Sequence, residues 1–87
     1  MINLENVHIG TLLTYTTNRL WNDGSKDINE NVKSIIEVTE LFDNRFHYKT
    51  VEVLEANNVI SNRTNVLINR TGGIFYNAIN RLDLEIK

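Results

Sequence analysis

The sequence predicts a mainly β protein built from one small antiparallel sheet. Ten isoleucines and only two alanines occur among the 87 residues, and side chains branched at Cβ are restricted in helices but pack well on a pleated surface. Apolar and polar residues alternate along several short stretches, which clusters of asparagine, aspartate and glycine separate. A chain of this length buries only about 60–65% of its unfolded surface, so we expect a single domain over 1–87 with a thin core.

The first strand is predicted at about Val7–Thr17, because apolar side chains recur there at alternate positions. Gly10 interrupts this pattern and indicates a bulge or a bend. Asn22–Ser25 is a strong turn signal, since asparagine, aspartate and glycine tolerate the backbone angles of tight turns. The polar segment that continues to Asn31 is predicted to be a mobile loop.

A central hairpin is predicted from two arms, Val32–Phe42 and Phe46–Glu55, joined by Asp43–Arg45. In the first half of the second arm the apolar residues have even numbers, and in the second half they have odd numbers. The apolar face therefore changes side near Thr50. A β-bulge at this point would keep both halves on one face and bend the strand across the core.

In the carboxyl-terminal part of the chain, the apolar residues first follow a helical spacing and then a strand alternation. Asn57–Asn58 indicates a turn, and a short strand is expected at about Asn65–Asn69. Apolar residues then fall at helical spacing, which predicts a helical turn at about Tyr76–Asn80. From Arg81 to Lys87 apolar and charged residues alternate, which predicts a closing strand.

This order of elements resembles the architecture of the SH3-like small barrels. The shared features are a long first loop, a central hairpin, a further strand, a helical turn and a closing strand. The resemblance implies a small five-stranded SH3-like barrel or a strongly bent antiparallel sheet, with the short helical turn before the last strand.

Composition limits the function classes that fit this chain. The net charge is −2 with 23% charged residues, which is ordinary for a soluble globular protein. No apolar run approaches the roughly 20 residues that a membrane-spanning helix needs. The absence of cysteine and of a leader-like amino terminus favours the cytoplasm.

One third of the chain is basic although the whole chain is acidic. Between Glu55 and Asp83 there is no acidic residue, and this stretch carries Arg63, Arg70 and Arg81. Arginines without neighbouring carboxylates suit a compact phosphorylated ligand, because the guanidinium group can donate two parallel hydrogen bonds to phosphate. Binding to long nucleic acid is disfavoured, since it relies on a broad basic surface. Alternatively, glutamates of the central hairpin pair with these arginines.

A glycine pair within this stretch predicts a ligand-binding loop. Adjacent glycines allow successive backbone N–H groups to converge on an anion, and the neighbouring guanidinium and tyrosine would complete the site. The alternative is that the glycines serve only turn geometry. The candidate residues are Asn69, Arg70, Thr71, Gly72, Gly73 and Tyr76.

A second candidate surface lies at the end of the first strand. Trp21 with Arg19 would form a partner-binding pair if the indole is exposed, because these residue types are enriched in binding hot spots. The alternative is that Trp21 packs in the core.

No catalytic signature, metal-ligand spacing or cofactor motif is present. His8 and His47 are far apart in the sequence, and no serine lies in a nucleophile context. We therefore expect a protein that is not an enzyme and that needs no metal or cofactor.

Two functional hypotheses follow from these patterns. In the first, the protein binds a nucleotide or another phosphorylated small molecule. In the second, it is an interaction module or inhibitor of a host enzyme that acts through an exposed sheet edge and the Trp21 loop, and it can self-associate into a homodimer. Fourteen asparagines are typical of an AT-rich gene, and this favours a phage-encoded accessory or anti-defence protein in the host cell cytoplasm.

Overall fold

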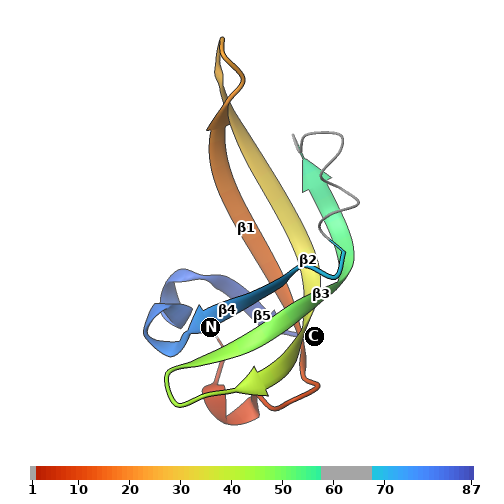
Figure 1. Ribbon diagram of the computed structural model, residues 1–87, viewed down its shortest axis with the longest axis vertical. Coiled ribbons are helices and arrows are strands. Elements are labelled where there is room, and N and C mark those ends of the chain that lie inside the picture. Colours follow the sequence, from red (N-terminus) through yellow and green to blue (C-terminus); the bar gives the residue numbers. More distant parts are fainter. Residues whose placement is uncertain (1, 58–67) are drawn as a thin grey trace.

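The structure is one bent antiparallel sheet with five strands. The computed structural model describes residues 2–57 and 68–87, and within them the strands follow the order β4-β3-β2-β1-β5 (Figure 1). The two edge strands β4 and β5 are not hydrogen-bonded to each other, so the sheet is open and the barrel alternative is not confirmed. The elements in chain order are η1 (Leu4–Asn6), β1 (Leu12–Asn22), β2 (Asp27–Leu41), β3 (Arg45–Asn57), β4 (Thr71–Phe75), η2 (Tyr76–Arg81) and β5 (Asp83–Ile86).

Strand β1 begins later than its sequence pattern predicts. Gly10 has φ +91° in a turn, and its N–H donates to the carbonyl of Val38 over 2.8 Å. The expected bend at Gly10 is thereby confirmed. It separates the preceding segment from the strand, which starts at Leu12.

The polar segment after Trp21 is a tight hairpin, so the predicted mobile loop is wrong. β1 and β2 pair continuously up to Asn22 opposite Asp27. The Asp23 carboxylate accepts the backbone N–H groups of Ser25 and Lys26, each over 2.9 Å, and Gly24 has φ +100°. These two hydrogen bonds hold the pKa of the Asp23 carboxyl below its usual value.

The central hairpin forms as predicted between β2 and β3. Ile35 lies opposite Glu52 whereas Ile36 lies opposite Thr50, so Val51 has no cross-strand partner. This irregularity is the bulge expected near Thr50. Further register shifts between Lys33 and Ser34 and between Val38 and Glu40 add to the curvature.

The carboxyl-terminal elements match the predicted order but not all of the predicted limits. The helical turn before the last strand is confirmed as η2, and the closing strand as β5. The short strand expected at 65–69 is only partly within the described residues, and Ile68–Asn69 form a turn. Asn57 is the last residue of β3, and Asn58 lies outside the described residues.

The core lies on the lower half of the concave face. Its largest fully buried side chain is Phe46, which packs near η2 at 6.4 Å between the ring centroids of Phe46 and Tyr76. The core cluster consists of Val7, Leu13, Ile36, Val38, Phe46, Ile74, Ile79 and Leu84. Beyond this cluster the β1–β2 ribbon extends toward one end of the molecule (Figure 1), whose longest extent is 44 Å. None of the helical segments in the described ranges is long and apolar enough to cross a membrane.

Replacing Phe46 by alanine should remove a large part of the stability of this small protein. The side chain is fully buried, and such substitutions typically cost about 3–5 kcal/mol of a total that is usually about 5–15 kcal/mol. Urea denaturation followed by circular dichroism measures the loss. Phe75→Ala is the control because that ring is 49% exposed. An equal loss in both variants would contradict this placement of the core.

Candidate functional site

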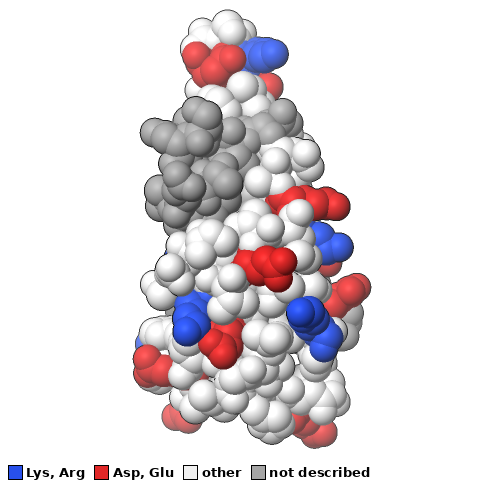
Figure 2. Space-filling view, turned by 90° about the vertical axis from the view of Figure 1, so that its right-hand side faces the viewer, with Lys and Arg blue, Asp and Glu red and all other residues white. Residues whose placement is uncertain are grey.

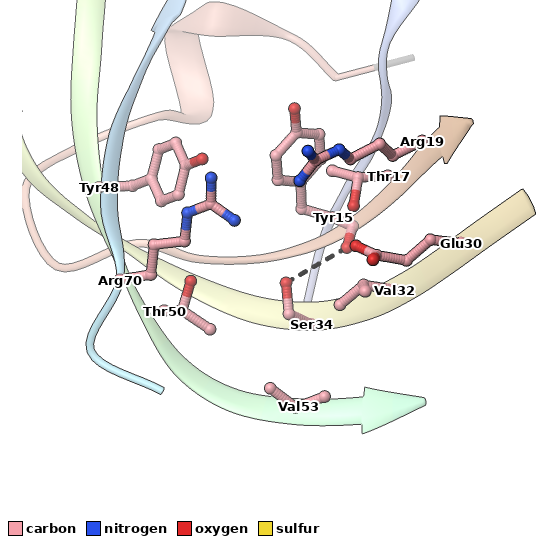
Figure 3. Close-up of a pocket in the computed structure, with 10 residues that line it drawn as sticks. All are labelled: Tyr15, Thr17, Arg19, Glu30, Val32, Ser34, Tyr48, Thr50, Val53 and Arg70. Carbon is pink, nitrogen blue, oxygen red and sulfur yellow. Dashed lines mark hydrogen bonds between the residues drawn. The ribbon is translucent and has the colours of Figure 1, made fainter. Parts of the chain in front are cut away.

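A hollow of about 260 Å³ lies on the concave face next to the core, and Figure 3 shows the residues that line it. It is called the concave hollow below. Three strands and the residue before β4 supply its lining, which consists of Tyr15, Thr17 and Arg19 from β1, Glu30, Val32 and Ser34 from β2, Tyr48, Thr50 and Val53 from β3, and Arg70.

Strand register determines which side chains line the hollow. On β1 and β2 the lining residues face one another in cross-strand pairs, Tyr15 with Ser34 and Arg19 with Glu30. Alternate residues of a strand share a face, so these positions all project to the concave side. On β3 the inward-facing residues change from even to odd numbers at Val51, because Val51 has no cross-strand partner. Val53 therefore lies opposite Ser34. The bulge thus adds Val53 to the lining.

Two tyrosine rings form the boundary of the hollow that is nearest to the core. The centroids of Tyr15 and Tyr48 are 5.9 Å apart, with the rings nearly perpendicular at 81°. Burial raises the pKa of both phenols, and the positive charge of Arg70 acts in the opposite direction on Tyr48. Both rings are therefore neutral at physiological pH, and each combines an apolar face with a hydroxyl group.

Polar groups on β2 and β3 continue the lining into the sheet. Ser34 and Thr50 are buried, and Ser34 Oγ donates to the carbonyl oxygen of Tyr15 over 3.4 Å. Glu30 is only 4% exposed. This half of the concave face therefore has a polar surface, in contrast to the apolar half that holds Phe46.

Two arginines approach the hollow from opposite sides (Figure 3). Arg19 comes from β1, whereas Arg70 precedes β4 and extends beside the ring of Tyr48. In the part of the chain that the structure describes, the one ion pair joins Lys49 Nζ to Glu37 Oε1 at 3.4 Å. Among the described residues, no ion pair joins Arg70 to Glu37, Glu40, Glu52 or Glu55 of the central hairpin.

The glycine pair lies in a strand, and the predicted loop from Asn69 to Gly73 is therefore wrong in its second half. Asn69 has φ +69° in the turn, whereas Thr71, Gly72 and Gly73 belong to β4. Neither glycine has positive φ, so their N–H groups do not form the expected anion-binding concavity. The backbone of Arg70 is held by the Thr50 N–H, which donates to the Arg70 carbonyl over 2.7 Å.

Gly72 has a packing role that its sequence context did not indicate. It lies opposite Tyr48, and a Cβ at this position would be 2.6 Å from the Tyr48 hydroxyl oxygen. The absence of a side chain at Gly72 allows the Tyr48 ring to lie across β4 and to reach Tyr15. Gly72 therefore shapes the hollow indirectly.

The remaining sequence candidates lie elsewhere or outside the described residues. Arg81 is in η2 and exposed, and it does not line the hollow. Tyr76 donates its hydroxyl hydrogen to the carbonyl of Phe42 over 2.9 Å, near the β2–β3 turn. Arg63 lies outside the described residues. Of the expected arginine cluster, the structure thus places only Arg70 at the hollow.

Trp21 is half-buried near the tip of the β1–β2 ribbon, opposite Ile28. Its indole nitrogen is enclosed without a hydrogen-bond partner among the described residues. Leu20, the preceding residue, is 68% exposed. Leu20 is thus the more exposed apolar side chain, and the exposure on which the partner-binding hypothesis for Trp21 depends is only partial.

Charge and donor chemistry limit what this site can do. Basic and acidic side chains are interspersed over the face shown in Figure 2, without a continuous basic surface in its described part. Within residues 2–57 and 68–87 there is no group of three or more histidines, cysteines, aspartates or glutamates that could hold a metal ion. The lining offers guanidinium, phenol and hydroxyl groups, which are binding groups for an anion with polar and aromatic parts.

Comparison with protein-family models, with curated proteins and with solved structures found no match for this chain.

Sequence reasoning missed Tyr48, Ser34 and Thr50 as site residues. It named Arg19, but it placed this residue with Trp21 at the end of the first strand and did not connect it with Arg70. The available signal was the alternation of Tyr15, Thr17, Arg19 and Trp21, which continues past the predicted strand end and places all four on one face.

Gly72→Ala should disturb the hollow by displacing Tyr48. Overpacking of this kind costs about 1–3 kcal/mol, and the clash disappears if the ring is absent. We expect the loss of stability from Gly72→Ala to be much smaller in a Tyr48→Ala background than in the wild type. A double-mutant cycle from urea denaturation measures the coupling. Additive effects would show that the two residues do not interact.

Proposed function

We propose that this protein is a non-catalytic binder of a small anionic ligand of the nucleotide type, held in the concave hollow between Arg19 and Arg70. The observation that carries this proposal is the approach of two guanidinium groups to one hollow from opposite sides. Arg19 belongs to β1 whereas Arg70 directly precedes β4, so one hollow brings together two residues that are far apart in the sequence.

Electrostatics favour an anion in this hollow. Arg19 and Arg70 contribute two positive charges and the buried Glu30 one negative charge, so the lining is positive within a chain of net charge −2. A phosphate group can accept parallel hydrogen bonds from a guanidinium, and such charge-assisted bonds are stronger than neutral ones.

The other lining groups suit the remaining parts of a nucleotide. Tyr15 and Tyr48 offer ring faces and edges to a nucleobase, and base–aromatic stacking is sequence-tolerant. Hydroxyl groups of Thr17, Ser34 and Thr50 can hydrogen-bond a sugar. The volume of about 260 Å³ is slightly below the usual range of about 300–1,000 Å³ for ligand pockets, which favours a ligand no larger than a mononucleotide over a polymer.

In this proposal the protein acts as a phage-encoded accessory or anti-defence factor that sequesters a nucleotide signal in the host cell cytoplasm. The asparagine-rich, alanine-poor composition supports such an origin. The genes that flank its own gene are the direct check, because early phage genes would support the role and a metabolic operon would contradict it.

A panel of mono-, di- and cyclic nucleotides should raise the melting temperature of the protein if this proposal is correct. A ligand at one hundred times its Kd stabilises the folded state by about 2.7 kcal/mol, which for a domain of this size is roughly 10–20 °C. Differential scanning fluorimetry measures the shift. The affinity of the best ligand then follows from calorimetric titration.

Arg19→Ala and Arg70→Ala should each weaken this binding about 10- to 150-fold, which corresponds to the roughly 1.5–3 kcal/mol of a charged hydrogen bond. Arg81→Ala is the matched control, because it removes one exposed arginine away from the hollow. A flat response to every nucleotide would refute the proposal. An equal loss of affinity in Arg81→Ala would show that the binding is not located at the hollow.

A second candidate function is protein binding through the β1–β2 ribbon. β3 pairs with β2 only as far as Asn31 opposite Asn57, so residues 19–30 extend as a two-stranded arm (Figure 1). This arm presents Leu20 with 68% exposure. A protruding apolar side chain of this kind suits insertion into a pocket of a host enzyme.

Leu20→Ser should abolish retention of a specific host protein in pull-down experiments if the arm is the contact. Arg70→Ala should leave retention unchanged, since Arg70 precedes β4 and is not part of the arm. Leu20 is a cleaner probe than Trp21, whose partial burial makes Trp21→Ala a change in folding as well as in contact. Retention that survives Leu20→Ser would exclude the arm as the contact surface.

A further inference from the structure

The two edges of the sheet differ in charge. β5 carries Asp83 and Glu85 within a strand of only four residues. Charged side chains and short length are the usual protection of an edge against pairing with another chain. β4 has the sequence Thr-Gly-Gly-Ile-Phe and contains neither a charge nor a proline. Both edge strands are short, but by the charge criterion the β4 edge is the less protected one.

Within the described residues, the backbone of β4 has N–H and C=O groups without a strand partner at alternate residues. The Tyr76 N–H donates to the Asn44 carbonyl over 2.9 Å, and the Thr50 N–H donates to the Arg70 carbonyl over 2.7 Å. Hydrogen-bonded pairs alternate in an antiparallel ladder, so Gly72 and Ile74 also direct their N–H and C=O groups to β3. The N–H and C=O groups of residues 71, 73 and 75 therefore point away from the sheet. All three of these residues are exposed.

We propose that the β4 edge binds a second copy of this chain, in an antiparallel pair whose twofold axis passes beside Gly73. In this register Thr71 lies opposite Phe75 of the second copy, and Gly73 lies opposite its own equivalent. The three outward-facing positions then form about six backbone hydrogen bonds, because each hydrogen-bonded pair of an antiparallel ladder exchanges two. The contact is self-complementary, as a twofold interface requires.

Three features of β4 favour a second copy of the same strand. No like charges meet across the axis, whereas like charges directly opposite destabilise a pair of strands. Gly73 leaves no side chain at the axis. Phe75, which is 49% exposed, gains cover for its ring, and Arg45 already lies at 5.9 Å from that ring's centroid.

The pairing would extend the sheet from five to ten strands. A twofold axis perpendicular to the sheet keeps both concave faces on one side, so the two hollows would open in the same direction. A contact formed by only five residues of each copy buries a small area compared with a standard interface, which buries about 1,200–2,000 Å². We therefore expect a reversible dimer with a Kd on the order of micromolar.

Sedimentation equilibrium between about 1 and 500 μM tests this inference. The wild type should follow a monomer–dimer equilibrium, and Thr71→Pro should weaken dimerisation at least tenfold, because it removes an outward N–H without breaking a bond to β3. Ile86→Pro is the matched control. The Lys87 N–H donates to the Leu12 carbonyl over 3.0 Å, so the Ile86 N–H points outward from the opposite edge. The Ile86→Pro variant should therefore dimerise with the same Kd as the wild type.

Two further measurements keep the result unambiguous. If circular dichroism shows that Thr71→Pro is unfolded, Thr71→Lys replaces it, since a lysine on an edge strand also opposes pairing with another chain. Amide exchange followed by NMR should protect the N–H groups of Gly73 and Phe75 at high protein concentration and expose them at low concentration. A wild type that stays monomeric up to about 500 μM would overturn the proposal, as would a dimer in which these amides stay exposed.

Discussion

Alternate residues of the long strand β2 project to the concave face along most of the strand, and the rest of the structure depends on this alternation. β2 is hydrogen-bonded to both β1 and β3, so its parity determines which side chains of its neighbours share that face. β1 follows this parity without interruption. β3 follows it only because Val51 is left out of the ladder, which returns Val53 to the inner side and bends the strand. Both the core and the hollow result from this single alignment.

The chemistry of the concave face changes from one end to the other. The lower half is apolar around Phe46 and Ile36, whereas the upper half contains Ser34, Thr50 and Glu30, all of them buried. Burying polar groups costs free energy unless they find partners, and a chain with so thin a core has little stability to spare. Ser34 has such a partner in the carbonyl oxygen of Tyr15, and Glu30 also has a partner. All three side chains line the concave hollow. They project from strands, which hold a site more rigidly than loops do.

Strand β4 connects the hollow with the sheet edge. Its two glycines serve different surfaces, because Gly72 faces inward beneath the Tyr48 ring and Gly73 faces outward at the edge. The strand starts directly after Arg70, whose carbonyl is bonded to Thr50. A second strand added to β4 would therefore restrain the backbone from which Arg70 extends. In this arrangement self-association would pre-order one side of the hollow.

Much of the fold could be predicted because its signals are local. The central hairpin, the bulge near Thr50, the helical turn and the closing strand each follow from a period or a change of parity within a few residues. The loop predicted after the turn at 22–25 was wrong because the strand residues up to Asn31 show no regular apolar alternation, although they pair with β1. The order of this segment comes instead from the Asp23 carboxylate, which caps the turn.

The sequence by itself thus determined the fold class and most of the element order. It also indicated Arg70 and Arg19 as candidate binding residues, each on a different surface. Only the tertiary structure decided that these two arginines line the same hollow, together with Tyr48, and that Arg81 and Tyr76 lie elsewhere. It also decided that Gly72 serves packing, since the ring above it comes from another strand. The physical reason is that local patterns report the backbone period of one element, whereas a site depends on strand order and register between distant residues.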